Sequence, residues 1–226
     1  MSEVFVDSNR LNESTTTHLS PDGRYRLLVT NYLTKPGCWE YTQGLVYRDD
    51  RQVAVIHRNH PTFPYAFICD HPDGHDYLIA GENYQGRTVI QLDTSRRVDV
   101  LLEDSPFCQQ EILPSPGGDR LAVLGCYWGG PQIVYLLNFS SPLDPSSWTV
   151  LHRSDDCDVN HVKWKGDYLL TYEVEDEVVK KFDKQEYLLS SGEKSELVEM
   201  MKSASLTESD IYEQRVLTKS ISLQTV

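Results

Sequence analysis

Carboxylates stand next to aromatic residues at two places in the chain, and such groups could catalyse proton transfer. Glu40 lies between Trp39 and Tyr41, and Glu82 begins a Glu-Asn-Tyr run. Two carboxylates can act as general acid and general base when burial or a neighbouring charge raises the pKa of one of them. His161 would add a group that titrates near neutral pH. Glu82, Glu40 and His161 are therefore the candidate catalytic residues.

Other reactive side chains fit a site less well. Cys108 or Cys126 with His161 could form a nucleophile–base pair, but isolated cysteines in strand-rich chains are usually buried and inert. Two pairs of histidines are spaced i, i+3 and i, i+4, which brings imidazoles to one side only on a helix. The sequence contains no phosphate-binding loop, nucleotide fingerprint or Gly-x-Ser-x-Gly motif. We therefore predict neither a metal nor a cofactor.

Composition limits the class of partner. Of the 226 residues, 39% are hydrophobic and 24% are charged, as in soluble globular proteins, and the formal net charge is -13. That charge opposes binding to nucleic acid and to anionic lipid. The start of the chain does not resemble a signal peptide, and no stretch is long and apolar enough to span a bilayer. Five widely spaced cysteines suit a reducing compartment. We expect a soluble, cytoplasmic protein that binds neither nucleic acid nor a membrane.

A glycine-containing turn followed by an apolar, β-rich run occurs four times. The anchor glycines are Gly23, Gly74, Gly118 and Gly166, which are 44 to 51 residues apart. This is the period expected for a four-stranded propeller blade. Reading each copy in order, we expect strands over 15–19, 25–29, 45–48 and 52–57; 65–69, 77–80, 88–92 and 98–102; 110–113, 121–124, 132–137 and 148–152; and 159–164 and 168–171.

The connection between the second and third strands also recurs. In the first three copies it carries an aromatic residue followed by glycine, at 41–44, 84–86 and 128–130, whereas the fourth copy has acidic residues at 173–176. In a propeller these connections lie at the end opposite the glycine turns, where aromatic, amide and acidic side chains could line a pocket. The expected ligand-binding residues are Trp39, Tyr41, Asn83, Tyr84, Glu111, Tyr127, Trp128 and Asn160.

The Pro-Asp-Gly hairpins resemble those of the WD40-like and PD40 families of propeller repeats, over roughly residues 15–183. The resemblance implies a fold and no partner, because the Trp-Asp dipeptide and Gly-His signature of WD40 repeats are absent. We predict an all-β protein, a small β-propeller of about four blades formed by four-stranded meanders. The alternative is an irregular β-sandwich. A strand over 3–7 could complete the fourth blade, or two chains could close the ring as a homodimer.

The chemistry of the chain changes near residue 185. We expect a propeller-like domain over 1–185 and a helical segment over 186–226 that packs on it or on a partner. Residues 193–204 contain no proline or glycine, and a second helix is expected over 211–217 after an N-cap at Thr207.

Three functions are open at this point. The leading one is a binding module that holds a protein partner or a small ligand on its aromatic and acidic loops. The second is a small enzyme, a hydrolase, lyase or isomerase, that uses Glu82 and Glu40 with Tyr84 and His161. The third is a structural subunit that makes an oligomer contact through its C-terminal helices.

Overall fold

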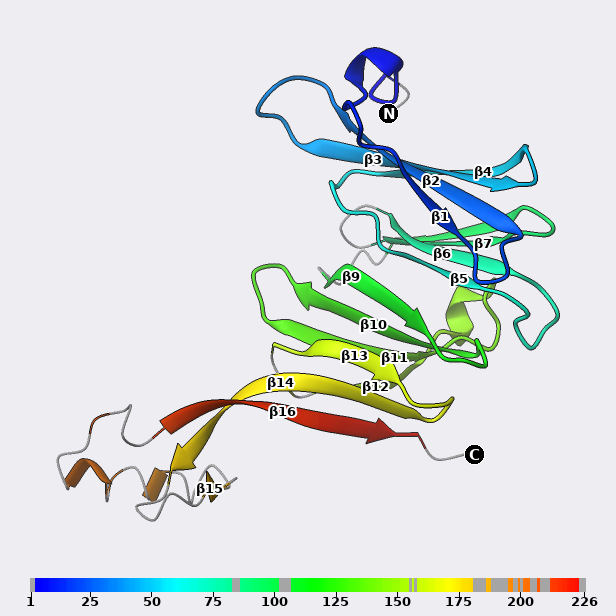
Figure 1. Ribbon diagram of the computed structural model, residues 1–226. Helices are drawn as coiled ribbons and strands as arrows, with labels where there is room; N and C mark the ends of the chain where they lie inside the picture. The colour runs from blue at the N-terminus through cyan, green and yellow to red at the C-terminus, as the bar shows by residue number, and fades with distance from the viewer. Residues whose placement is uncertain are drawn as a thin grey trace.

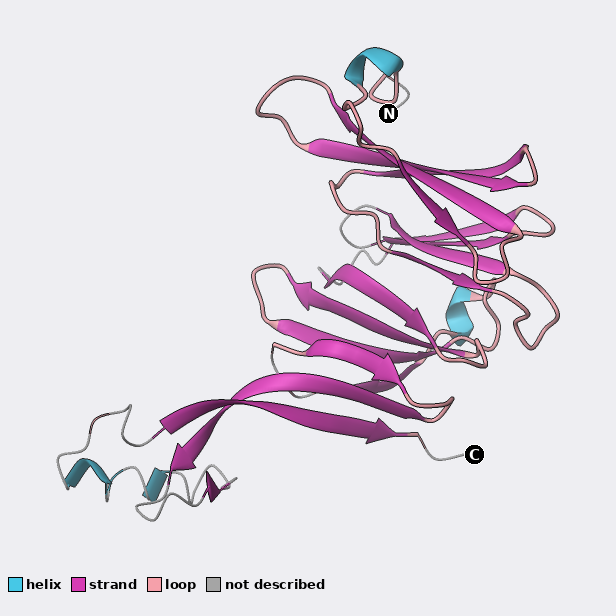
Figure 2. Ribbon diagram, in the orientation of Figure 1, coloured by secondary structure: helices cyan, strands magenta, loops and turns pink. Residues whose placement is uncertain are grey.

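Four antiparallel β-sheets, each of four strands, make up the described part of the computed structural model (Figures 1 and 2). The structure describes residues 3–82, 86–101, 107–154, 156, 158–180, 186–187, 195–196, 199, 201–203, 207 and 212–223. Within these residues, no helix is long and apolar enough to cross a membrane. The all-β prediction is therefore confirmed.

Each sheet comes from a continuous part of the chain, apart from the last strand of the fourth sheet. The strands are β1 (Thr16–Leu19), β2 (Tyr25–Leu33), β3 (Glu40–Arg48) and β4 (Arg51–Arg58); β5 (Tyr65–Ile68), β6 (Tyr77–Glu82), β7 (Gly86–Gln91) and β8 (Arg96–Leu101); β9 (Phe107–Pro114), β10 (Arg120–Tyr127), β11 (Gln132–Asn138) and β12 (Val150–Arg153); and β13 (Asn160–Trp164), β14 (Leu169–Lys180), β15 (Glu186–Tyr187) and β16 (Tyr212–Ser222). The first three sheets are meanders whose strands pair in chain order. Every strand predicted within the four repeat copies overlaps one of these elements.

The glycine of the repeated turn has a similar positive φ in all four copies. Gly23, Gly74, Gly118 and Gly166 have φ between +72° and +85°, a region that residues with a Cβ rarely adopt. In the first three turns the glycine N–H donates to the carbonyl three residues earlier, at 2.8 to 2.9 Å. We call the end of the stack that carries these four turns the turn end.

Side-chain alternation gives each inner sheet two apolar faces, and these faces form three buried layers. Neighbouring residues such as Leu78 and Ile79 are both fully buried, but they belong to different layers. Each such side chain contributes about 1.5–3 kcal/mol on burial. The layers include Leu27, Ile56, Leu78 and Ile90 between the first and second sheets; Ile79, Val89, Leu121 and Val123 between the second and third; and Ala122, Leu136, Leu170 and Val174 between the third and fourth.

The four sheets form an open stack. The N-terminus lies beside the first sheet and the C-terminus beside the fourth, at opposite ends of the stack (Figure 1). None of the three layers described above joins the fourth sheet to the first. The outer faces of these two terminal sheets are therefore not packed against each other as they would be in a closed ring.

The predicted strand over 3–7 was wrong. Asp7–Asn9 form a short 3₁₀ helix, η1, and the preceding residues are turns and bends. The Phe5 ring stacks on His57 with the ring centroids 4.1 Å apart, and it meets Tyr32 edge-on at 5.2 Å. The N-terminus therefore covers the part of the outer face of the first sheet that carries Tyr32 and His57, because Phe5 packs on these rings.

The predicted helix over 211–217 was also wrong. Residues 212–222 form β16, which pairs with β14 along its whole length. The segment alternates in burial, with Ile221 in the apolar layer and Val216 61% exposed, as expected for a strand with one covered face. The described residues of the predicted 193–204 helix are helical. The C-terminal segment thus supplies a strand to the fourth sheet in addition to helical residues.

Candidate functional site

The predicted site lies at the end of the stack opposite the glycine turns. The β2–β3 connection (34–39) and the β10–β11 connection (128–131) both project there, and β13 begins there (Figure 1). We call this region the loop end. The sorting of connections follows from the meander, because successive antiparallel connections alternate between the two ends of a sheet.

Trp39 is exposed at the loop end but held in place. Its side chain is 49% exposed, and its indole N–H donates to the carbonyl oxygen of Asn59 at 3.1 Å. The ring also meets the His60 imidazole edge-on, with centroids 5.6 Å apart. Burial lowers the pKa of His60 below its ordinary value, so its ring is neutral near pH 7. The indole is thus positioned before any partner arrives.

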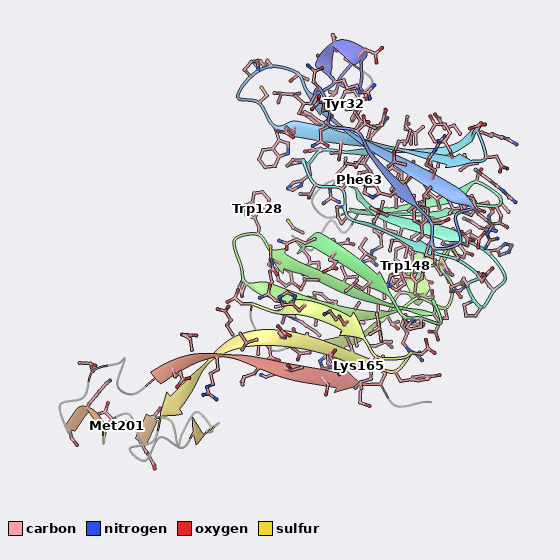
Figure 3. The ribbon with its side chains drawn as sticks, in the orientation of Figure 1. Tyr32, Phe63, Trp128, Trp148, Lys165 and Met201 are labelled. Carbon is pink, nitrogen blue, oxygen red and sulfur yellow. The ribbon has the colours of Figure 1, made fainter. Side chains whose placement is uncertain are left out.

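Trp128 is the more exposed tryptophan, at 67%. Figure 3 shows it projecting from the β10–β11 connection at the loop end. The turn beneath it is tight: Gly129 has φ +73°, and the Gly130 N–H donates to the Tyr127 carbonyl oxygen at 2.7 Å. A short turn of this kind holds the backbone that carries the exposed ring.

Tyr127 packs into the third sheet. Its ring meets Phe107 at 5.5 Å, and its hydroxyl forms a hydrogen bond with that of Tyr135. Burial and this neighbour raise the pKa of Tyr135 to about 12. The Arg153 guanidinium lies 5.4 Å from the centroid of the Tyr127 ring. These contacts assign Tyr127 a packing role beneath Trp128.

Glu40 and Tyr41 lie in strand β3 and not in a loop. Glu40 accepts a hydrogen bond from the Asn31 side-chain amide at 3.1 Å, and the same amide donates to the Pro61 carbonyl oxygen. Tyr41 is paired with Tyr32 across β2 and β3. The expectation that Tyr41 belongs to the connection was wrong, because β3 begins at Glu40 and includes the aromatic-to-glycine run.

Part of the predicted site lies outside the described residues. Asn83 and Tyr84 fall there, as does the side chain of Glu82, whose backbone ends β6 opposite Gly86. Glu111 is described and is exposed on β9.

His161 and Asn160 begin β13 in the fourth sheet. His161 has φ +51°, and both residues line a cavity of about 250 Å³ whose carboxylates are Glu173 and Glu175. Glu40 is in the first sheet, at the other end of the stack. The described structure therefore brings His161 to carboxylates of its own sheet and not to Glu40.

A cluster at the turn end has the composition of a metal site. One ligand atom from each of Asp22, Cys69 and Asp76 lies within 4.8 Å of the others. The Arg24 guanidinium, however, forms ion pairs with Asp22, with Asp70 at 3.1 Å and with Asp76 at 3.0 Å. Burial raises the pKa of the Cys69 thiol to about 11, which disfavours the thiolate that metals require. The cluster is an ion-pair network that links the first two sheets.

Arg87, in the second sheet, is not among the residues predicted from the sequence. Arg87 is 6% exposed on β7, and its Nε donates to the Gln109 side chain at 3.3 Å. Its signal was a single cation inside an otherwise uncharged strand, Gly86–Gln91.

A viral protein is similar to this chain over most of its length. No protein-family model matches the chain. A protein of Acanthamoeba polyphaga mimivirus, described as uncharacterized protein R762, is 32% identical over 197 residues. The alignment covers 83% of this chain and 77% of the viral protein.

Proposed function

The chain belongs to the same family as that viral protein, and we propose that it is a binding module whose loop end captures a protein partner. The observation that carries the proposal is the pair of exposed tryptophans, Trp39 and Trp128, at one end of the stack. Tryptophan is the residue type most enriched among side chains that dominate binding energy. The rest of the loop end would provide complementary contacts around these two anchors.

The fixed position of Trp39 favours binding. An indole held by the Asn59 carbonyl and the His60 ring loses little side-chain freedom when a partner covers it. Ordering a free side chain at an interface costs about 0.5–1.5 kcal/mol, and that cost is largely absent here.

The charge at the loop end favours a partner segment with basic residues. Glu40, Glu173 and Glu175 lie at this end, and the chain as a whole carries a formal charge of -13. A basic segment with apolar side chains would meet both the carboxylates and the indoles. Opposite charge would also speed its association at low salt.

We infer that the four sheets are blades of a β-propeller of the WD40-like type. The inference is supported by the shared glycine turn, by the meander order of the first three sheets and by their face-to-face packing. Leu28 and Leu45 point away from the second sheet, because their neighbours Leu27 and Val46 face it. A second copy of the chain, placed over this outer face, would continue the stack and close the ring as a homodimer.

An enzymatic role has less support. Glu40 and His161 lie in different terminal sheets, and the cavity beside His161 has Glu173 and Glu175 as its carboxylates. A hydrolase, lyase or isomerase would need its acid and base within hydrogen-bond reach of one substrate.

Alanine substitution of the two tryptophans tests the binding module. Trp39→Ala and Trp128→Ala should each reduce quantitative capture of a partner from cell extract by about tenfold or more, the effect of a hot-spot residue. The melting temperature should change little, because both side chains are exposed. Leu19→Ala is the matched control: Leu19 is 63% exposed but is the last residue of β1, at the turn end.

Two results would contradict the proposal. Equal loss of capture in the Leu19→Ala variant would show that the partner does not bind specifically at the loop end. A large fall in melting temperature in either tryptophan variant would show that the indoles hold the fold together.

A further inference from the structure

A cavity of about 280 Å³ lies between the second and third sheets. Its walls are mostly apolar, unlike the acidic and aromatic loop end. Val100 of β8 and Val150 of β12 come from the edge strands of the two sheets, and Val150 is 57% exposed, which places it at the rim. Phe107 and Val123 form part of the floor contributed by the third sheet. The space is therefore a pocket with an entrance at the outer edge of the stack.

The β11–β12 connection supplies the remaining wall. It contains the short helix η2 (Pro145–Ser147), which is followed directly by Trp148. Figure 3 shows Trp148 where the second and third sheets meet. Its indole N–H donates to the Ser141 carbonyl oxygen at 3.3 Å, and its ring lies 5.7 Å from that of Phe139. The indole is thus held against the pocket.

Arg87 is the only charged residue among the described walls of this pocket. It lies beside the Trp148 ring, 5.4 Å from the centroid, and its Nε donates to the Gln109 side chain. The Gln109 amide is itself fixed by a 3.4 Å hydrogen bond to the Gly86 carbonyl oxygen. The guanidinium is therefore held in one orientation by neutral groups.

The two terminal nitrogens of Arg87 have no hydrogen bond or ion pair to any residue that the structure describes. Arg87 lines the cavity, and none of the other described lining residues carries a charge that could pair with it. Burial without a carboxylate lowers the pKa of Arg87 to about 10. A buried guanidinium normally has an anionic partner, because removing its charge from water is costly.

We propose that this pocket binds a small organic monocarboxylate, with its carboxylate on Arg87 and its apolar body against Trp148 and Phe107. A guanidinium offers two parallel N–H groups that match the two oxygens of a carboxylate. The apolar walls would hold the rest of the molecule. The site is independent of the loop end.

Charge and size narrow the class of ligand. One guanidinium and one neutral amide balance a single negative charge, so a phosphate dianion would remain under-neutralised. A cavity of about 150 Å³ accepts benzene, and this pocket has nearly twice that volume. The expected ligand therefore has about ten non-hydrogen atoms. Octanoate and phenylpropionate have this size and serve as probes.

Isothermal titration calorimetry on the full chain tests the proposal. Phenylpropionate should bind about tenfold or more tightly than phenylpropanol, which has nearly the same shape without the charge. Phenylpropylamine should bind more weakly than either. Arg87→Met, which keeps an unbranched side chain but removes the guanidinium, should abolish the preference for the carboxylate. Arg51→Met, at an exposed position on β4, should preserve it.

A second variant tests the pocket independently, so that the proposal can still be refuted if the Arg87→Met chain does not fold. Val150→Trp should fill the entrance from the exposed rim and abolish binding of phenylpropionate while leaving Arg87 in place. The proposal is overturned if phenylpropanol binds as tightly as phenylpropionate, if none of the probes binds, or if a folded Arg87→Met or Val150→Trp chain binds the carboxylate as the wild type does.

Discussion

Asp76 joins the first two sheets, and its replacement by alanine should destabilise the whole stack. Its side chain is buried just before β6, yet it accepts hydrogen bonds from the Tyr25 hydroxyl of β2 at 3.0 Å and from the Asp70 backbone N–H at 3.0 Å. Arg24 adds an ion pair at 3.0 Å. One carboxylate therefore satisfies donors from two sheets.

The expected cost follows from the donors that Asp76→Ala leaves behind. Tyr25 is 1% exposed, so water cannot easily replace the lost acceptor of its hydroxyl. An unsatisfied buried donor costs about 1–3 kcal/mol. The Asp70 N–H is only part-buried, and Arg24 keeps Asp22 and Asp70 as partners, so these groups add little. We expect a loss of ~1–3 kcal/mol, which is a fall of ~2–12 °C in melting temperature for a chain of this size.

A double-mutant cycle separates this coupling from general damage. Tyr25→Phe removes the donor and should cost about 1 kcal/mol alone. Combined with Asp76→Ala, it should add much less than that amount, because the unsatisfied hydroxyl is gone. Urea unfolding followed by circular dichroism measures each free energy. Strict additivity, or a cost of Asp76→Ala below about 0.5 kcal/mol, would refute the reasoning that this carboxylate couples the sheets.

Two further predictions concern pH and assembly. Burial lowers the pKa of His57, whose Nε2 accepts a hydrogen bond from the Gln43 amide at 3.0 Å, so the unfolded chain binds the proton more readily. Stability should therefore fall as the pH is lowered through about 6.5, and His57→Phe should reduce that slope in urea titrations; an unchanged slope would contradict this. If a second copy closes the ring, light scattering should give the mass of two chains, and Leu45→Asp on the outer face of β3 should return it to one. A wild-type monomer at high concentration would exclude the homodimer.

Most of the sheet structure could be predicted because its signals are local. A glycine that must adopt positive φ, followed by an apolar run, sets the position of each hairpin, and this held at all four anchor glycines. The errors occurred where a distant partner decides the structure. Val216 and Ile221 belong to the C-terminal segment that was predicted to be helical. The segment is a strand because its backbone forms hydrogen bonds with the edge of β14, which is distant in sequence. The sequence around Phe5 is likewise typical of a strand, but contacts of the Phe5 ring with Tyr32 and His57 decide its conformation.

The candidate site could be predicted only in part. The sequence placed Trp39 and Trp128 at one end, because connections in a meander alternate between ends. It could not show that Tyr127 is packed against Phe107, since that depends on the fold of the third sheet. Nor could it show that Glu40 and His161 lie in terminal sheets that are not packed on each other.

The departure from the repeat is the best sequence signal for the Arg87 pocket. The connection between the third and fourth strands is only 49–50 in the first sheet and 92–95 in the second, but it extends over 139–149 in the third. The longer connection contains Pro145 and Trp148, which line the cavity between the second and third sheets. The shorter connections of the first two sheets contain no equivalent residues. The same cavity receives Arg87, a cation in a strand that packing alone would fill with an apolar residue. An insertion and a buried charge that meet at one cavity are therefore the two sequence features on which the proposed carboxylate site rests.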